Sequence, residues 1–342
     1  MKYLICQDWQ STSNNHAGMK YLALKLQELY PNDIKVFVLP YYKWQAKKTL
    51  VYNVMSKIDG LKHILLVKLY FNKIIKTASK DSEVLHMELD NSPVLINELE
   101  KLKKKRPDIR ASIMIHLCPY QYEGIFTEAF LKRVDSCVDK VVTLGHTLTE
   151  YFNEKSFFLN KTCTTLHYVD SFYAKQSELN VHKPLRVLAM GNQARNQEVL
   201  MKIVKANPNI KFTICQGMSD LSGLFKDVMN VNLIPFVDEN ELRGYMDESD
   251  ISLNIMRDTI GSNVVVTSLA MGMAMICSDV GSIHDYCNED NTIFCKNSDI
   301  KTFSDALSFL HGNPDVVLKM KKSAIKESKR FTISKFYNDV FY

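Results

Sequence analysis

The stretch from Asp258 to Tyr286 constrains the fold more than any other part of the chain. A turn at Gly261-Ser262-Asn263 opens a predicted helix over 264–271, Gly272 ends that helix, and 274–277 reads as a short buried strand. The loop 278–282 then opens a second predicted helix, so the run reads helix, strand, loop, helix. Such alternation, with small residues at the turns, is typical of parallel α/β sheets.

The start of that helix is a candidate anion site. The first backbone N–H groups of a helix have no partner within it and carry partial positive charge, so Ser262 and Asn263 would suit a diphosphate. Ser and Asn are also preferred helix N-caps, and a purely capping role stays open for both residues.

Length and composition place the chain among ordinary globular proteins. A length of 342 residues predicts two domains, and a hydrophobic share of 46% suffices for two cores. The N-terminal apolar run is too short for a signal peptide, and no run reaches the roughly 18 apolar residues of a spanning helix. Eight scattered cysteines lack CxxC or zinc-site spacing, so we expect reduced thiols and a cytoplasmic protein, free or peripheral on a membrane.

Two successive β/α series run through the sequence. The first begins with strand 2–6, helix 19–29 and strand 34–39, and the second begins at Leu185 after a polar linker. No G-x-G-x-x-G follows the first strand, which excludes a dinucleotide oxidoreductase. The predicted parts are an N-terminal domain over 1–178, a C-terminal domain over 179–328, and a terminal helix over 329–342 that could cross back to the first domain.

Positive charge is concentrated in the first half. Residues 1–175 hold 25 Lys and Arg against 18 Asp and Glu, whereas the remainder holds 18 against 20. Nine lysines and one acid lie between Lys43 and Lys80, and Lys62, Lys73 and Lys76 share one helical face. A broad apolar face lies opposite, made of Leu61, Ile64, Leu65, Val67, Phe71, Ile74 and Ile75. This pattern fits either a core-packed helix with a solvated lysine face or contact with an anionic membrane; no nucleic-acid motif accompanies it.

Several polar residues follow predicted strands, where parallel sheets bind ligands. Strand 111–117 carries His116 near its end, where either a structural hydrogen bond or a functional contact is reasonable. Arg195 lies in the loop after strand 185–190 and could bind phosphate or be solvated. Further candidates are His16 in the first loop, Tyr120 and Tyr122 as acceptor-side or hinge residues, and Asp170 as a structural residue.

The motifs together resemble a known family. The segments LRVLAMG (185–191), NLIPFVDENELRGYMDESDISLNI (232–255) and TSLAMG followed by AMICSDVGS (267–282) are similar to the group 1 glycosyltransferases of glycosyltransferase family 4, as is ASIMIHL (111–117). The resemblance is firm over 185–310. It implies the α/β GT-B fold, with two Rossmann-like domains and a cleft between them.

The resemblance also implies a donor site for a nucleotide sugar, which is a substrate and not a cofactor. His116 would contact the transferred sugar. The base would lie at the backbone of Phe236 and Val237, and Thr267 stands where the family binds the ribose. The residues that would approach the diphosphate are Gly18, Gly191, Arg195, Gly261, Ser262 and Asn263.

Two departures from the family pattern bear on activity. The paired glutamates of the family fall at Thr259 and Thr267, and Asn192 stands where the family has an arginine. We expect a retaining, hexosyl-type transferase that acts on a lipid-linked or cell-surface polysaccharide precursor at the inner face of the membrane. The alternatives are a catalytically degenerate GT-B protein that binds a nucleotide sugar or a partner subunit, and a nucleotide-sugar epimerase. No Asp-x-Asp motif occurs, so no metal is predicted.

Overall fold

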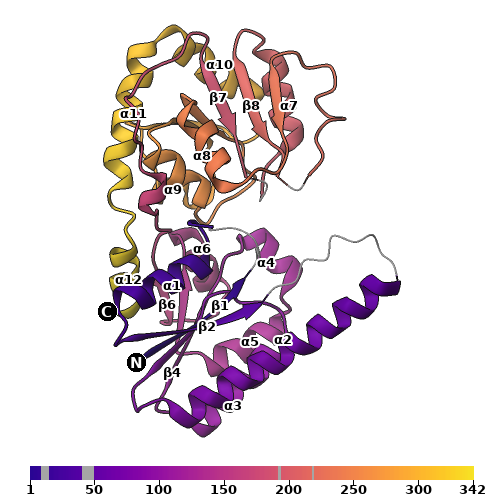
Figure 1. Ribbon diagram of the computed structural model, residues 1–342, viewed down its shortest axis with the longest axis vertical. Helices are drawn as coiled ribbons and strands as arrows, with labels where there is room; N and C mark the ends of the chain where they lie inside the picture. Colours follow the sequence, from indigo (N-terminus) through magenta and orange to yellow (C-terminus); the bar gives the residue numbers. More distant parts are fainter. Residues whose placement is uncertain (9–14, 41–49, 192–193, 218) are drawn as a thin grey trace. The chain divides into compact units, whose positions relative to one another are not determined.

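The chain folds into two compact units (Figure 1). The computed structural model describes all residues except 9–14, 41–49, 192–193 and 218. Unit 1 comprises Met1–Thr165 and Tyr337–Tyr342, and unit 2 comprises Leu166–Phe336. The lysines at 43, 47 and 48 and the predicted Asn192 position lie outside the described residues.

The division falls after Thr165, whereas the polar linker in the sequence predicts it after residue 178. The segment that follows Thr165 is bound by backbone hydrogen bonds within unit 2. The amide of His167 donates to the Tyr286 hydroxyl at 3.0 Å, and the amide of Val169 donates to the carbonyl of Phe331 at 2.8 Å. The linker therefore starts before the polar stretch near residue 180 that marked it in the sequence.

Unit 1 contains a six-stranded parallel sheet in its described part, with the strand order β2-β1-β3-β4-β5-β6. The strands are β1 (Lys2–Asp8), β2 (Ile34–Pro40), β3 (Glu83–His86), β4 (Arg110–Met114), β5 (Lys140–Thr143) and β6 (Thr162–Thr164). The helices are α1 (Met19–Leu29), α2 (Leu50–Thr77), α3 (Pro93–Lys105), α4 (Pro119–Ile125), α5 (Glu128–Cys137) and α6 (His146–Glu154). Because parallel crossovers are right-handed, α1 covers one face, and α2, α3 and α5 pack side by side on the other.

Unit 2 contains a second six-stranded parallel sheet, with the order β12-β11-β10-β7-β8-β9. Its strands are β7 (Arg186–Ala189), β8 (Lys211–Cys215), β9 (Val231–Ile234), β10 (Ile251–Asn254), β11 (Ala274–Ser278) and β12 (Thr292–Cys295). Its helices are α7 (Gln197–Ala206), α8 (Glu239–Asp247), α9 (Asn263–Ala270), α10 (Ile300–Gly312) and α11 (Pro314–Ser328), with single 3₁₀ turns η1 (Ser171–Tyr173) and η2 (Gly281–Asp285). The α/β class with two parallel sheets is confirmed.

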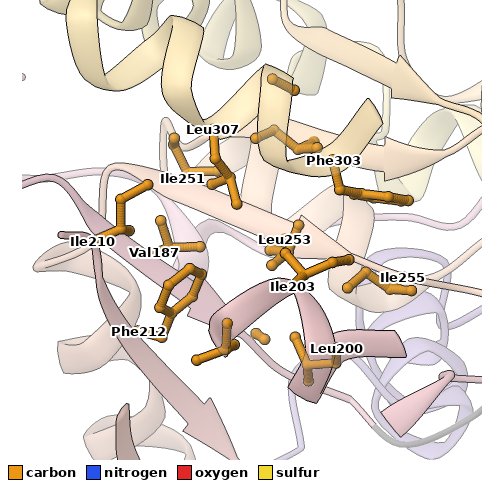
Figure 2. Packing of buried hydrophobic residues seen from close by; sticks show 14 of the residues in the cluster. Val187, Leu200, Ile203, Ile210, Phe212, Ile251, Leu253, Ile255, Phe303 and Leu307 are labelled. Carbon is orange, nitrogen blue, oxygen red and sulfur yellow. The ribbon is translucent and has the colours of Figure 1, made fainter. Parts of the chain in front are cut away.

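Both faces of the second sheet are buried, which explains its continuous apolar strands. Alternate residues of β11 point to opposite faces: Ala274 and Ile276 join the cluster beneath α7 and α10, and Met275 and Cys277 join the cluster beneath α9 and α11. Figure 2 shows the first cluster, with Phe303 and other apolar side chains packed against the strands. This packing holds the strand ends that carry the site.

The helix α2 corrects the predicted apolar face. Val67, Phe71 and Ile74 are buried against the body of unit 1, as expected, but Leu61 and Leu65 are 61% and 66% exposed. No described residue of α2 before Val67 is buried. The amino-terminal half of α2 extends past the sheet (Figure 1). No described helix is both long enough and apolar enough to cross a membrane.

A short helix lies where the sequence indicated only a loop. Pro119 occupies the first turn of α4, and a capping box joins Cys118 to Gln121, with the Gln121 Oε1 accepting from the Cys118 amide at 3.1 Å. Tyr122 on this helix is fully buried, with its ring 4.6 Å from Phe126 and 5.1 Å from Phe152. It packs the core of unit 1.

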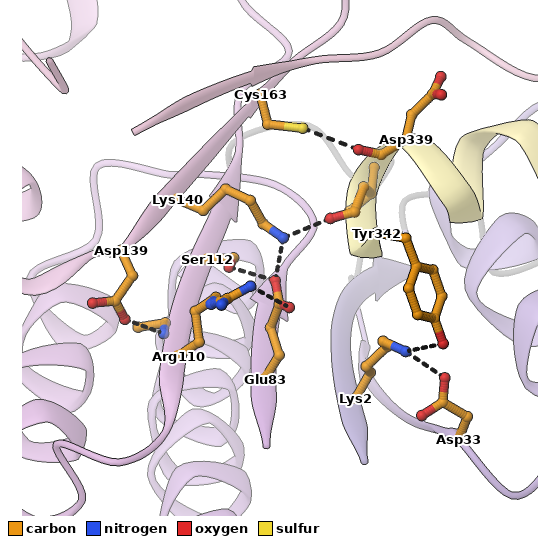
Figure 3. A network of polar contacts seen from close by, with 12 residues as sticks. Lys2, Asp33, Glu83, Arg110, Ser112, Asp139, Lys140, Cys163, Asp339 and Tyr342 are labelled. Atoms are coloured by element: carbon orange, nitrogen blue, oxygen red, sulfur yellow. Dashed lines mark hydrogen bonds and ion pairs between the residues drawn. The ribbon is translucent and has the colours of Figure 1, made fainter. Parts of the chain in front are cut away.

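The C-terminal residues pack on unit 1 through α12 (Ile333–Phe341). The Tyr337 ring stacks on Tyr30 at 3.9 Å, and the Lys140 Nζ donates to the carbonyl of Val340 at 2.5 Å. Figure 3 shows this junction, where Lys140 also forms an ion pair with the buried Glu83 at 2.5 Å. The chain thus returns to its first unit at Tyr337.

Candidate donor-binding site

The candidate site in unit 2 lies where the sheet changes direction. Chain order reverses between the neighbouring strands β7 and β10, so the loops that follow them diverge at the carboxyl edge. In open α/β sheets, ligands bind at this switch point. The two loops here are 190–196, which contains Gly191 and Arg195, and 255–262, which leads into α9.

The Gly191 loop lies directly against the first turn of α9. Gly191 has a φ of +81°, in the left-handed region, and a side chain there would place its Cβ 2.8 Å from the Val264 Cγ2. Both the backbone conformation and the contact require glycine. The loop and the helix start, which are about 70 residues apart in sequence, therefore form one surface.

Arg195 is held beside Gly191 by backbone contacts. The Ala194 carbonyl accepts from the Arg257 amide at 2.7 Å, and the Asn196 amide donates to the Ile255 carbonyl at 3.0 Å. Ala194 itself has a φ of +57°, which is strained for a residue with a side chain. This conformation places the Arg195 Nη2 3.8 Å from the position that a Cβ on Gly191 would occupy.

The Arg195 guanidinium is the clearest electrostatic feature of the site. Burial lowers the pKa of Arg195 to about 10, so the group stays charged at neutral pH. Its Nη1 is buried and has no hydrogen-bond partner in the part of the chain that the structure describes. A buried charged donor without an acceptor is costly, and a phosphate oxygen would satisfy it.

The amino-terminal end of α9 faces the same loop. Ser262 caps the helix, with its Oγ accepting from the Val264 amide at 3.2 Å, and its carbonyl accepts from the Val265 amide at 3.0 Å. Gly261 has a φ of +121°, which favours glycine. Asn263 is the first helical residue. The capping role of Ser262 is therefore present, and the helix dipole still directs positive charge toward this end.

The two threonines at the glutamate positions of the family are engaged locally. The buried Thr267 donates its hydroxyl hydrogen to the Asn263 carbonyl at 2.7 Å, so toward a ribose it could only accept a hydrogen bond. Thr259 is also buried, and its Oγ1 accepts from the Gly261 amide at 3.1 Å. Both side chains shape the loop before α9.

Asp258, next to Thr259, is a carboxylate that sequence reasoning did not single out. Its Oδ1 accepts from the Thr259 amide at 2.7 Å, and burial raises the pKa of Asp258. The carboxylate lies against Gly281, where a Cβ would come within 2.4 Å of the Asp258 Oδ1. A signal was present in the sequence, because Asp258 directly precedes the position where the family has a glutamate.

Phe236 and Val237 lie beside the edge of the unit 2 sheet and not beside its central strands. They follow the edge strand β9, which β8 separates from β7. Phe236 is 56% exposed, so its ring is accessible to a planar ligand. The structure therefore gathers Gly191, Arg195 and the residues from Gly261 to Thr267, and it places Phe236 and Val237 two strands away.

His116 belongs to unit 1, in the loop after β4. Its Nε2 lies 2.6 Å from the Met87 carbonyl, which can only accept, so Nε2 carries the hydrogen. Burial lowers the pKa of His116 to about 4, which keeps the imidazole neutral at neutral pH. A neutral ring in this tautomer presents Nδ1 as a hydrogen-bond acceptor, a role suited to a sugar hydroxyl.

Gly18 caps the amino-terminal end of α1 in the same unit. Its amide donates to the Asn15 carbonyl at 3.0 Å, and an added Cβ would lie 3.2 Å from the Asn15 Nδ2. The His16 ring lies 4.7 Å from the Tyr21 ring.

Asp170, in unit 2, caps η1 by accepting from the Phe172 amide at 2.9 Å, which agrees with its predicted structural role.

The architecture has known counterparts among solved structures. Sucrose-phosphate synthase from Thermosynechococcus elongatus is 12% identical, with a TM-score of 0.74 over 100% of this chain and 99% of that one. HepE from Anabaena, in complex with UDP and glucose, is 10% identical, with a TM-score of 0.71 over 99% and 98%. A glycosyltransferase from Rickettsia africae is 11% identical, with a TM-score of 0.67 over 99% and 97%. At such identities these matches show the fold, which is GT-B.

A family model matches most of unit 2. Residues 184–313, which contain the whole Gly191–Arg195–α9 surface, match the family described as glycosyl transferases group 1. Comparison with curated proteins gives no match. Residues 184–313 thus form a group 1 glycosyltransferase domain, which supports a transferase, and the chain as a whole has the GT-B fold.

Proposed function

We propose that the protein is a retaining glycosyltransferase that moves a hexosyl group from a nucleotide sugar to a lipid-linked or cell-surface polysaccharide precursor. The acceptor oxygen forms a bond to the anomeric carbon on the face that the leaving group vacates. The bond from that carbon to the diphosphate oxygen breaks, and its electron pair leaves with the nucleoside diphosphate. The proton of the acceptor hydroxyl passes to the released diphosphate.

The observation that carries this proposal is the Arg195 guanidinium. It is buried and charged, and its Nη1 lacks a partner among the described residues. It lies beside Gly191, which itself packs against the first turn of α9. A cation, a close-approach glycine and a helix dipole on one surface suit the negative charge that develops on a leaving diphosphate.

The remaining proposed roles rest on the family resemblance. Phe236 and Val237 would hold the base, and Thr267 would accept a hydrogen bond from the ribose. His116 would accept a hydrogen bond from a hydroxyl of the transferred sugar, and Gly18 would approach the diphosphate. No metal ion and no cofactor take part in the proposed reaction.

Uridine nucleotides are the first donors to test. HepE was solved in complex with UDP-glucose, and TarM from S. aureus with fondaparinux, alpha-GlcNAc-glycerol and UDP. The fondaparinux complex of TarM supports a glycan as the acceptor here. We place the protein on the cytoplasmic face of an anionic membrane, with Lys62, Lys73 and Lys76 facing the lipid.

One observation favours a second function. Thr259 and Thr267 offer no carboxylate, and the Thr267 hydroxyl hydrogen is bonded within α9. A degenerate GT-B protein that binds a nucleotide sugar without transferring it would fit these features. Turnover separates the two functions. A protein that only binds the nucleotide sugar would be stabilised by it but would not release nucleoside diphosphate from it.

The test is release of nucleoside diphosphate from a panel of nucleotide sugars, with and without membrane extract as the acceptor source. We expect release from at least one donor, faster with extract and unchanged by EDTA. Loss of activity in EDTA would contradict the metal-independent reaction. Binding of a donor without any release, under both conditions, would replace the transferase with the degenerate binder.

A further inference from the structure

The helix α2 carries an apolar stripe on the side that faces away from the rest of unit 1. Its members are apolar side chains that are 38% to 66% exposed, namely Val54, Ile58, Leu61, Leu65 and Leu69. At 100° per residue these five positions fall within roughly 80° of one another. They span 16 residues, from Val54 to Leu69, which is about 22 Å of helix. We call these five residues the α2 stripe.

The α2 stripe is distinct from the face that packs on unit 1. The packed face is fixed by Val67, Phe71 and Ile74, which are buried, and by the Tyr70 hydroxyl, which donates to the Val38 carbonyl at 3.0 Å. These residues lie on the other side of the helix from the α2 stripe. The exposed leucines therefore have no part in the core of the described structure.

Lysines border the α2 stripe on both sides. Lys57 and Lys68 lie along one edge, and Lys62 and Lys73 lie along the other. Asp59, which is the only acidic residue of α2, is largely covered and is 3.8 Å from Lys62. An apolar strip with cations on each side and no exposed acid is complementary to a bilayer surface, where acyl chains meet anionic headgroups.

The same charges argue against a second copy of this chain as the occupant. Two α2 stripes packed together would bring the lysine edges of both helices into proximity, and like charges at such edges are destabilising. A continuous row of exposed apolar side chains is typical of an interaction surface. Lysines distributed along the length of α2 would also hold the helix flat on a membrane instead of across it.

We propose that α2 docks the protein on an anionic membrane by inserting the α2 stripe between the headgroups, with the flanking lysines on the phosphates. This inference deepens the proposed function and rests on it, because the proposed function gives the enzyme a membrane-bound acceptor. It differs from purely electrostatic docking because the leucines, and not only the lysines, carry the binding energy. The prediction is binding that added salt weakens but does not abolish.

The test is flotation of the full-length protein with vesicles of phosphatidylcholine and phosphatidylglycerol, and with vesicles of phosphatidylcholine alone. The stripe variant combines Leu61→Gln, Leu65→Gln and Leu69→Gln. The matched control makes the same change at Leu24, Leu29 and Leu159, which are exposed by 43%, 48% and 52% elsewhere on unit 1. A charge variant combines Lys62→Glu, Lys73→Glu and Lys76→Glu.

We expect the wild type and the leucine control to float with the anionic vesicles. The stripe variant should lose about tenfold or more of this partitioning, because its lost apolar area no longer enters the bilayer. The charge variant should bind weakly at low salt. If the stripe variant floats like the wild type, or if the wild type does not float, the inference is wrong. A change of oligomeric state in the stripe variant, without a change in flotation, would assign the stripe to a second copy.

A second measurement guards against misfolded variants. Leu65→Trp keeps an apolar side chain, and its added emission should shift to the blue with anionic vesicles; no shift relative to the parent would contradict insertion. Donor turnover in the absence of vesicles should be equal in all variants. Vesicle binding without any turnover would contradict only the proposed function. Turnover without vesicle binding would contradict only this inference.

Discussion

At the scale of single residues, Arg195 combines a cost to stability with a role in binding. Its guanidinium is buried beside Gly191 with Nη1 unpartnered among the described residues, so the unbound protein carries an unfavourable charge. Functional groups are often held in such positions, because the ligand that relieves the cost also gains the interaction. The strained Ala194 next to it fits the same pattern.

We predict that Arg195→Gln leaves the melting temperature of the unbound protein unchanged or raises it, because the replacement removes a desolvated charge. Differential scanning fluorimetry without ligand measures this. Arg186→Gln is the matched control, since Arg186 lies at the opposite end of β7, 45% exposed and 3.5 Å from Glu248. A melting temperature that falls only in the Arg195 variant would show that Arg195 stabilises the unbound fold.

The second prediction concerns pH. The pKa of His116 falls from 6.5 to about 4 on folding, so between these values the unfolded chain binds more protons than the folded one. Stability should therefore decline as the pH falls from 6.5 toward 4. Denaturant unfolding at several pH values should show a shallower decline in His116→Gln, with His311→Gln on α10 as the control.

Part of this decline should remain in the His116 variant. His86 is also buried, and burial lowers its pKa as well. An identical pH dependence in the wild type and His116→Gln would contradict the neutral state of His116 in the folded protein.

Residue types near strand ends were predictable, but their conformations were not. Gly191 and Arg195 could be selected because a short loop after a buried strand has few roles. The left-handed conformation of Ala194 depends on backbone bonds to residues 255–257, which are distant in sequence. Asp258 was passed over because the family pattern directed attention to the next position.

At the scale of elements, the site depends on one loop fitting against one helix. Gly191 leaves no room for a side chain, since a Cβ would come within 2.8 Å of Val264. The start of α9 is thereby fixed relative to Arg195. Strand ends alone would not give this arrangement.

We predict that Gly191→Ala destabilises the protein by roughly 1–3 kcal/mol, through both the positive φ and the clash. It should also weaken nucleotide binding, because α9 must shift. Gly244→Ala in α8 is the control, because nothing lies within 4 Å of an added Cβ there. Alanine favours a helix interior more than glycine does, so this variant should be more stable than the wild type. Urea unfolding of both variants measures the difference, and an unchanged midpoint for Gly191→Ala would count against the tight packing.

Helix periodicity predicted that α2 and α3 exist, but not which faces are covered. The apolar residues of α2 wrap around most of the helix, and only its carboxyl-terminal half meets the body of unit 1. Leu61 and Leu65 therefore read as core residues although they are exposed. Likewise α4 is too short for periodicity to reveal, and its capping box with Cys118 is an uncommon one.

At the scale of the whole molecule, two similar sheets are linked by a chain that crosses from unit 1 to unit 2 and back. The return through α12 ties the C-terminus to the first strand: the Tyr337 hydroxyl donates to Asp33, which also pairs with Lys2 at 2.5 Å. Cys163 and Thr165 bond to Asp339 from the other side. The sequence predicted the terminal helix but could not identify these partners, because they are hundreds of residues away.

We predict that Phe341→Ala destabilises unit 1 by about 3–5 kcal/mol, as expected for loss of a buried aromatic side chain. The Phe341 ring lies 5.4 Å from both Lys2 and Lys140, so their contacts would loosen as well. Tyr342→Ala, at a residue that is 86% exposed, should cost less than about 1 kcal/mol. Equal effects in the two variants, measured by denaturant unfolding, would mean that the C-terminus contributes no buried packing.

The most direct test is a calorimetric titration of the wild type and Arg195→Gln with nucleoside diphosphates and with the corresponding nucleosides. We expect at least one diphosphate to bind the wild type far more tightly than its nucleoside does. Arg195→Gln should weaken that diphosphate by about tenfold or more and leave the nucleoside unchanged, because charge-assisted phosphate bonds are lost. Equal diphosphate affinity in the two proteins, or no binding of any nucleotide by the wild type, would contradict a donor site built on Arg195 and the start of α9.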